Sequence, residues 1–165
     1  MKRFLRRAAL RSPQREPGNG TAGEKWTIYW NEYSSNTYLY GSEISYHAKD
    51  DVEFSNELMP PGTVIKQWYS RTYYQLQRIE PALPMIDGEG EYRLRVHIDC
   101  PEGERWLIQL VFFDKYDAEA GRIAIRDQVS YFRCPLRTYS YSMQLINGAS
   151  SGLPLHPHII HPSNA

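Results

Sequence analysis

Alternation of apolar and polar residues with a period of two is the feature that most constrains how this chain folds. From Trp26 onward the alternation recurs in short runs, and the run from Tyr92 to Ile98 is a regular example. Successive side chains of a β-strand point to opposite faces, so the pattern is typical of strands with one buried and one solvated face. The strands predicted in this way span residues 26–31, 38–46, 63–69, 92–99, 106–113, 122–125, 129–133, 139–145 and 155–161.

Helical signals are nearly absent beyond residue 24. No segment there sustains apolar residues at i, i+3, i+4 and i+7 between capping residues, and prolines from Pro60 to Pro162 separate the short runs. Many short strands divided by turn signals predict an all-β fold, an antiparallel β-sandwich with jelly-roll topology. A chain of 165 residues can bury the core of one such domain, which we assign to residues 25–165.

Residues 1–24 differ from the rest of the chain in charge. They hold six Lys and Arg residues against two Glu, and prolines and glycines follow one another between Pro13 and Gly23. We expect a basic, flexible N-terminal tail that is solvated, although weak attraction to an anionic membrane surface or to a partner stays open. Arginines interrupt its apolar residues, so it does not have the pattern of a secretory signal.

Composition excludes some classes of function. The longest apolar run, Leu110–Phe113, is far shorter than the roughly 20 residues of a transmembrane helix. The 19 Lys and Arg residues balance 19 Asp and Glu residues, which argues against nucleic-acid binding. Cys100 and Cys134 lack metal-ligand spacing and are expected as reduced thiols in a cytoplasmic protein, with a disulfide between adjacent strands left open.

Two motifs near the C-terminus carry possible chemistry. Residues 148–152 (GASSG) match a nucleophile elbow centred on Ser150, but the Pro-containing residues 153–157 cannot open the helix that this elbow needs. A Gly/Ser turn is therefore favoured over a hydrolase. The histidines of HPHIIH could offer two imidazoles to a metal from one strand face, but a polar edge strand is favoured. These histidines are His156, His158 and His161.

Carboxylates gather in three predicted turns. Those of the loop Asp114–Gly121 could chelate calcium, but their spacing is not that of an EF-hand, and a solvated hairpin tip is favoured. Paired carboxylates could suit glycoside hydrolysis, but exposed turn charges are favoured. The pairs are Glu89 with Glu91 and Glu102 with Glu104. We therefore expect no catalytic residues, no metal and no cofactor.

The remaining signal is aromatic, since aromatic residues make up 13% of the chain. Residues 68–75 (WYSRTYYQ) place rings among amide, hydroxyl and guanidinium groups. Aromatic faces stack on the C–H surfaces of sugars, and neighbouring amides supply directional hydrogen bonds. Burial of these rings between the sheets is the alternative. The candidate glycan-binding residues are Asn56, Trp68, Tyr73, Tyr74 and Gln75.

A longer stretch resembles a known family. It starts with Phe54–Trp68 (FSNELMPPGTVIKQW) and continues through Tyr139–Tyr141 (YSY) and Gln144–Asn147 (QLIN). Over residues 38–160 the chain resembles the third family of accessory secretory proteins of the Gram-positive accessory Sec system. The resemblance implies a fold similar to a carbohydrate-binding module and no catalytic role.

The resemblance also implies partners and a location. Such proteins belong to the cytoplasmic machinery that glycosylates and exports serine-rich-repeat glycoprotein adhesins, with peripheral association at the inner face of the membrane left open. The implied partners are two companion proteins, one glycosyltransferase-like and one esterase-like, together with the accessory SecA motor and the adhesin substrate. We expect a non-enzymatic subunit with weak glycan binding; the alternative is a purely structural adaptor without sugar contact.

The LMPPG run has a physical interpretation of its own. Pro60 and Pro61 stiffen the entry into a turn, and Gly62 permits positive φ before a strand that starts at Thr63. Leu58 and Met59 are either buried in the core or exposed as a protein-contact knob. Burial is favoured, because Leu and Met are usually buried.

Overall fold

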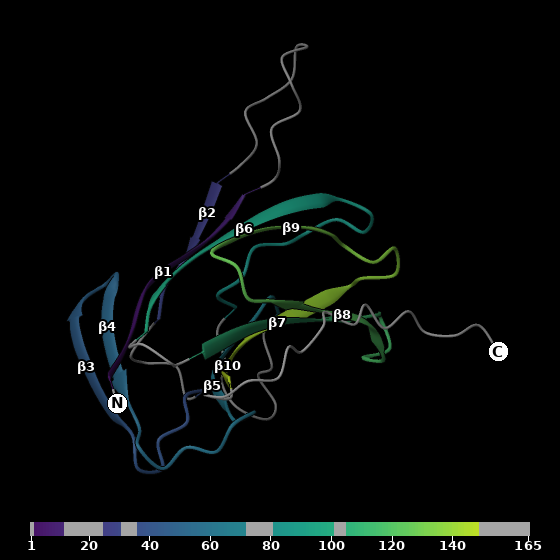
Figure 1. Ribbon diagram of the computed structural model, residues 1–165. Coiled ribbons are helices and arrows are strands. Elements are labelled where there is room, and N and C mark those ends of the chain that lie inside the picture. The colour runs from purple at the N-terminus through teal and green to yellow at the C-terminus, as the bar shows by residue number, and fades with distance from the viewer. Residues whose placement is uncertain (1, 12–24, 31–35, 72–80, 101–104, 149–165) are drawn as a thin grey trace.

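The computed structural model describes residues 2–11, 25–30, 36–71, 81–100 and 105–148. Ten β-strands and no helix occur among them, and every strand pair is antiparallel (Figure 1). Within this part of the chain, no helix is long and apolar enough to cross a membrane. The strands are β1 (Lys2–Arg11), β2 (Lys25–Ile28), β3 (Glu43–Ala48), β4 (Asp51–Ser55), β5 (Val64–Tyr69), β6 (Glu91–Asp99), β7 (Arg105–Phe113), β8 (Glu119–Ile125), β9 (Val129–Arg133) and β10 (Ser140–Gly148).

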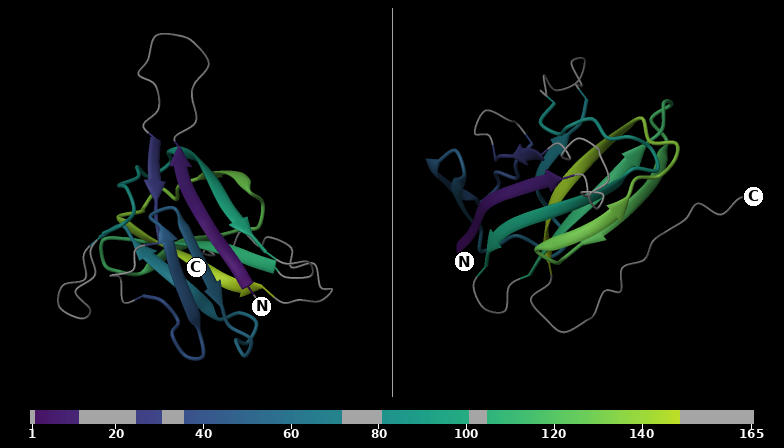
Figure 2. Two further views of the ribbon diagram at one scale, coloured as in Figure 1. Left: turned by 90° about the vertical axis from the view of Figure 1, so that its left-hand side faces the viewer. Right: turned by 90° about the horizontal axis from the view of Figure 1, so that it is seen from above.

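The strands form two sheets that face each other across the core (Figures 1 and 2). A six-stranded sheet has the order β3-β4-β1-β6-β9, with β2 also paired to β1, and a four-stranded sheet has the order β5-β10-β7-β8. The ring of Phe112 on β7 lies 6.2 Å from that of Phe132 on β9, which joins the two layers. The predicted antiparallel β-sandwich is confirmed; jelly-roll topology and likeness to a carbohydrate-binding module stay predictions.

The regular period-two runs formed the strands that the pattern predicts. On β6 the buried residues Leu94, Val96 and Ile98 alternate with exposed ones. The run 106–113 is apolar on both faces, and β7 is indeed an inner strand, paired with β10 and β8. Of the predicted strand 38–46 only the end is extended, since β3 begins at Glu43. Residues 155–161 lie outside the described residues.

The predicted flexible tail needs a correction for residues 2–11. These residues form β1, an inner strand that pairs with β2, β4 and β6, whereas residues 12–24 lie outside the described part. A register shift between Leu5 and Arg7 breaks the period-two pattern, which places Leu5, Ala8 and Leu10 opposite the buried residues of β6. Without this shift, the second residue after Leu5, which is Arg7, would lie opposite the next buried residue of β6 in place of Ala8. The sequence pattern alone therefore did not indicate a strand.

The two cysteines differ in burial. Cys134 is buried and Cys100 is partly buried, and neither takes part in a disulfide. Burial raises the pKa of the Cys134 thiol, so the neutral form that the core favours is retained. That the thiols are reduced in the protein stays a prediction.

Candidate partner-docking site

Trp68, the centre of the predicted glycan surface, lies in the core. It is only 4% exposed, its Nε1 donates a hydrogen bond of 2.9 Å to the carbonyl oxygen of Tyr29, and its ring meets Trp30 edge-on with centroids 6.4 Å apart. A sugar platform requires an open aromatic face. Trp68 therefore belongs to the alternative that the sequence left open, burial between the sheets.

The other predicted glycan residues do not join Trp68 in one site. Tyr73, Tyr74 and Gln75 lie outside the described residues. Asn56 is 7% exposed, and its side chain is used within the protein. Its Nδ2 donates to the carbonyl oxygen of Tyr40 and to Ser42 Oγ, both at 2.8 Å, and its Oδ1 accepts from the backbone N–H of Leu58 at 3.0 Å.

Those three hydrogen bonds make Asn56 the link between two surface loops. The first loop turns at Gly41, where φ is +67°, and is closed by a bond from the backbone N–H of Ser42 to the carbonyl oxygen of Leu39. The second loop is the LMPPG run. Because one amide side chain binds both backbones, the two loop tips lie side by side and are held in fixed positions.

The LMPPG run is fixed at its other end by a second asparagine. Asn147 of β10 donates from Nδ2 to the carbonyl oxygens of Met59 (3.0 Å) and Pro60 (3.1 Å), and its own carbonyl oxygen accepts from Gly62 N–H at 2.8 Å. Gly62 has φ +84°, as expected for the turn. The following strand begins at Val64, one residue later than predicted.

Leu58 and Met59 have opposite environments. Met59 is partly buried and packs against the core, whereas Leu58 is 80% exposed. The prediction of burial was therefore wrong for Leu58, because its backbone N–H is bound to Asn56 and its side chain is turned to solvent. Leu39 and Tyr40 on the neighbouring loop are 68% and 79% exposed. We call Leu39, Tyr40 and Leu58 the loop-end site.

The loop-end site has the properties of a protein-contact surface. Covering a Leu or an aromatic side chain gains about 1.5–3 kcal/mol relative to exposure, so leaving three such side chains in water is unfavourable for the free chain. Holding the loops in place beforehand lowers the entropy lost when a partner covers them. Its members are apolar side chains and one phenol, so the site suits binding by burial of surface.

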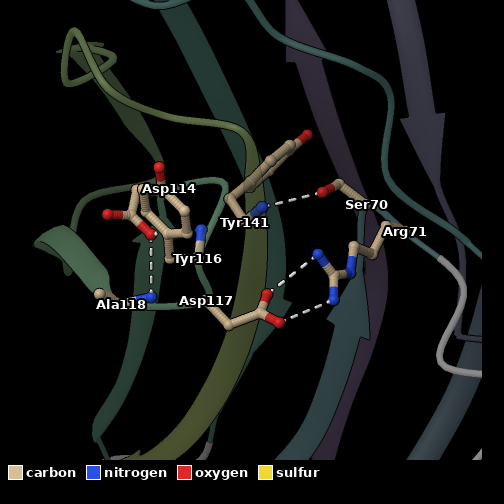
Figure 3. Close-up of polar contacts among 7 residues, drawn as sticks. All are labelled: Ser70, Arg71, Asp114, Tyr116, Asp117, Ala118 and Tyr141. Atoms are coloured by element: carbon tan, nitrogen blue, oxygen red, sulfur yellow. Dashed lines mark hydrogen bonds and ion pairs between the residues drawn. The ribbon is translucent and has the colours of Figure 1, made fainter.

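A carboxylate loop lies between β7 and β8 (Figure 3). Asp114 Oδ1 accepts from the backbone N–H groups of Tyr116 (2.8 Å) and Ala118 (3.0 Å). Both carboxylate oxygens of Asp117 face the guanidinium of Arg71, at 2.9 and 3.0 Å, and Glu119 pairs with Arg122. These carboxylates are occupied by protein donors, which supports the solvated hairpin tip over a calcium loop.

Lys66 is a buried cation that sequence reasoning missed. It has no exposed surface, its Nζ donates to Thr37 Oγ1 at 2.9 Å, and it lies 6.0 Å from the centroid of the Trp30 ring. Burial lowers its pKa to about 8. Its signal in the sequence is weak, because the apolar residues Ile65 and Trp68 are three positions apart, so the run around Lys66 does not alternate regularly.

The motifs with possible catalytic or metal chemistry are not assembled in the described residues. Ser150 and the three C-terminal histidines lie outside them, as do Glu102 and Glu104. Within the described ranges no group of three or more His, Cys, Asp or Glu residues is placed to hold a metal ion. Glu89 is used in an exposed ion pair with Arg133 at 3.6 Å.

Comparison with known proteins gives the family. Residues 37–161 match the family model described as accessory Sec secretory system ASP3. The chain belongs to this family. Among curated proteins it is 33% identical over 138 residues to the accessory Sec system protein ASP3 of Streptococcus gordonii, covering 78% of this chain and 87% of that protein. The resemblance drawn from the LMPPG run is thereby confirmed.

Two solved complexes contain chains of similar structure. One is the crystal structure of accessory secretory proteins 1, 2 and 3 of Streptococcus pneumoniae, with a TM-score of 0.67 and 30% identity over 73% of this chain and 84% of that chain. The other is a glycosylation-associated protein (Gap123) complex of Streptococcus agalactiae, with a TM-score of 0.66 and 28% identity over 73% of this chain and 39% of that chain.

Proposed function

We propose that this chain is a non-catalytic subunit of an accessory Sec complex and binds accessory secretory proteins 1 and 2 through the loop-end site. The observation that carries the proposal is the exposure of Leu39, Tyr40 and Leu58 on two loops fixed by one buried asparagine. Relatives of this chain occur in complexes with accessory secretory proteins 1 and 2, which supports an assembly role.

The complex would act on serine-rich-repeat glycoprotein adhesins during their glycosylation and export. In this role the chain works in the cytoplasm, at or near the inner face of the membrane, and meets the accessory SecA motor. The sandwich contributes surfaces rather than chemistry, in keeping with the carboxylates of the 114–119 loop being bound to protein donors.

Weak glycan binding is the competing proposal. The burial of Trp68 removes the largest ring of the predicted surface, so this role would rest on Tyr73, Tyr74 and Gln75. An N-acetylglucosamine-bearing serine-rich peptide tests it: adaptor function predicts unchanged backbone NMR shifts in the isolated chain, and glycan binding predicts shifts that saturate. The buried position of Trp68 favours the adaptor.

Co-expression with accessory secretory proteins 1 and 2 of the same organism tests the docking proposal. The double variant Tyr40→Ser and Leu58→Ser removes two apolar contacts while the backbone groups that bind Asn56 remain. We expect the complex to weaken by about tenfold or more in size-exclusion and pull-down assays. Met85→Ser is the matched control, since Met85 is 93% exposed and lies outside the loop-end site. Equal assembly of the double variant and the wild type would contradict the proposal.

A further inference from the structure

The strand β3 forms one edge of the six-stranded sheet. In the part of the chain that the structure describes it pairs with β4 alone, and it lies at the margin of the molecule (Figures 1 and 2). Alternate residues of an edge strand direct their backbone N–H and C=O groups away from the sheet, where these groups can pair with a further strand. β3 therefore offers a backbone template along its outer edge.

The usual protections of an edge strand are weak in β3. Natural edge strands are blunted by lysine, by proline or by a β-bulge. Residues 43–48 contain neither lysine nor proline, and the register shift against β4 comes only after Tyr46. Lys49 follows at the hairpin turn, where its Nζ lies 4.4 Å from the centroid of the Tyr29 ring. Residues 43–46 thus lack these three protections against pairing with another strand.

The core-facing row of β3 is half open. Ile44 and Tyr46 stand opposite Phe54 and Val52 of β4, which are 2% and 1% exposed, so both pairs lie on the core-facing side of the sheet. Ile44 is only partly buried, and Tyr46 is 39% exposed. The core is therefore closed at β4 and half open at β3, and apolar residues of an added strand would cover this row.

The other edge of the same sheet is different. On β9 the core-facing Phe132 is 7% exposed, and its ring lies 5.7 Å from that of Tyr92 and 6.2 Å from that of Phe112. The core is closed at this edge, so an added strand would bury little further apolar surface there. β9 therefore serves as the control for β3.

Charge indicates what kind of segment fits β3. Its outward-facing row starts with the exposed Glu43, and residues 43–55 hold four carboxylates against one lysine, with His47 Nε2 placed 3.3 Å from Glu53 Oε2. The strand β1, which carries basic residues, lies on the far side of β4 from the free edge. A second copy would bring two acidic hairpins together, whereas a basic residue of a partner opposite Glu43 would form a favourable cross-strand pair.

The free edge continues from the loop-end site. β3 begins three residues after Tyr40, and the backbone N–H of Ser42, the residue before β3, is bound to the carbonyl oxygen of Leu39. A partner that covers Leu39 and Tyr40 thus lies next to the edge of β3. We propose that β3 accepts an extended segment of this protein partner as an added strand, apolar at alternate positions and with a basic residue opposite Glu43. This inference rests on the proposed function of the loop-end site.

Amide exchange at single-residue resolution tests the proposal in the complex with co-expressed accessory secretory proteins 1 and 2. The amides of residues 43–46 fall into two alternating sets, one directed to β4 and one to the free edge. We expect the second set to exchange about tenfold or more slowly in the complex than in the free chain, and the amides of β9 to change by less than about twofold.

Lysine substitutions compare the two edges. Tyr46→Lys places a charge on the row that the added strand would cover, and Tyr131→Lys places the same charge on β9, at a position that is 69% exposed. We expect the first variant to weaken the complex by about tenfold and the second by less than about twofold in the pull-down assay, because only the first charge loses its water. Circular dichroism verifies folding; should Tyr46→Lys fail to fold, the exchange of the wild type decides alone.

The outcomes separate strand addition from the proposed function. Unchanged exchange in β3 together with slower exchange at residues 38–42 and 57–59 would overturn strand addition and leave the loop-end site as the contact. Unchanged exchange in both regions would overturn both proposals. Slower exchange in β3 on concentrating the free chain alone would identify a second copy as the occupant, and equal weakening by the two lysine variants would remove the distinction between the edges. Either result would overturn the inference.

Discussion

At the scale of single residues, two buried asparagines fix the loops that carry the candidate site. Asn56 and Asn147 are 7% and 6% exposed, and both use their amide groups to bind loop backbones. A buried amide without such partners would be costly, so the loops and the asparagines stabilise each other. The hydrogen bond from the backbone N–H of Leu58 to the Asn56 side chain therefore fixes the position of the exposed Leu58.

Replacing Asn56 with Ala should lower the free energy of unfolding by about 2 kcal/mol. The substitution removes three hydrogen bonds and leaves the carbonyl oxygen of Tyr40 and the N–H of Leu58 without their partner. Urea denaturation measures the change. Gln128→Ala is the control, at an exposed position, and should stay within about 0.5 kcal/mol of the wild type. A loss that small for Asn56→Ala would mean that the two loops are held by other contacts.

Lys66 makes stability depend on pH in a defined direction. Its folded-state pKa of about 8 lies below the ordinary lysine value of 10.5. Between these pH values the unfolded chain therefore binds more protons, and the Lys66 contribution to stability rises with pH. Raised pKa values of Tyr92, Tyr141 and Cys134 act in the opposite sense in alkaline solution.

Comparison of wild type with Lys66→Met isolates the lysine. Below pH 8, Lys66 of the wild type is protonated in both the folded and the unfolded state. Burial of its ammonium then lowers the stability of the wild type by the full desolvation cost. We expect the stability of the variant relative to wild type to fall as the pH rises from 8 to 10.5, by up to about 1.4 kcal/mol per pH unit. Urea denaturation at several pH values measures this difference. A difference that stays constant with pH would show that the ammonium is not desolvated.

At the scale of elements, sequence patterns succeed where a strand alternates without interruption. The runs that became β6 and β10 were predicted because apolar residues recur at every second position, and the run that became β7 because nearly every residue is apolar. The strand β4 was not predicted, although Val52 and Phe54 are buried, since five residues after a charged turn give little signal.

The candidate site was harder to predict for a physical reason. Trp68 and Leu58 were assigned from residue type, but type does not fix burial. The indole of Trp68 is buried because Tyr29, distant in the sequence, accepts its hydrogen bond. In β1 a register shift decides which residues lie opposite the buried residues of β6, and such a shift depends on the partner strand.

The conformation of the LMPPG turn predicts how substitutions at Gly62 change stability. Its φ of +84° is unfavourable for residues with a Cβ, yet no atom lies within 4 Å of where that Cβ would be. The cost of Gly62→Ala should thus come from the backbone alone, at about 1–2 kcal/mol of unfolding free energy. Gly62→Asn should lose less, because asparagine adopts positive φ more readily. Thermal denaturation of the two variants compares them, and equal, negligible losses would contradict a conformational role.

At the scale of the whole molecule, the balanced net charge conceals separate surfaces. The loop-end site is apolar, the outer face of β6 carries both basic and acidic residues, and β3 and β4 carry carboxylates. Surfaces of different chemistry on one rigid sandwich suit a subunit that contacts more than one neighbour.

Hydrogen exchange on the complex with accessory secretory proteins 1 and 2 tests the central claim most directly. We predict that the amides of residues 38–42 and 57–59 exchange more slowly in the complex than in the free chain, and that those of the 114–118 loop do not change. Unchanged exchange in both loop-end segments, together with protection of another surface, would contradict the account.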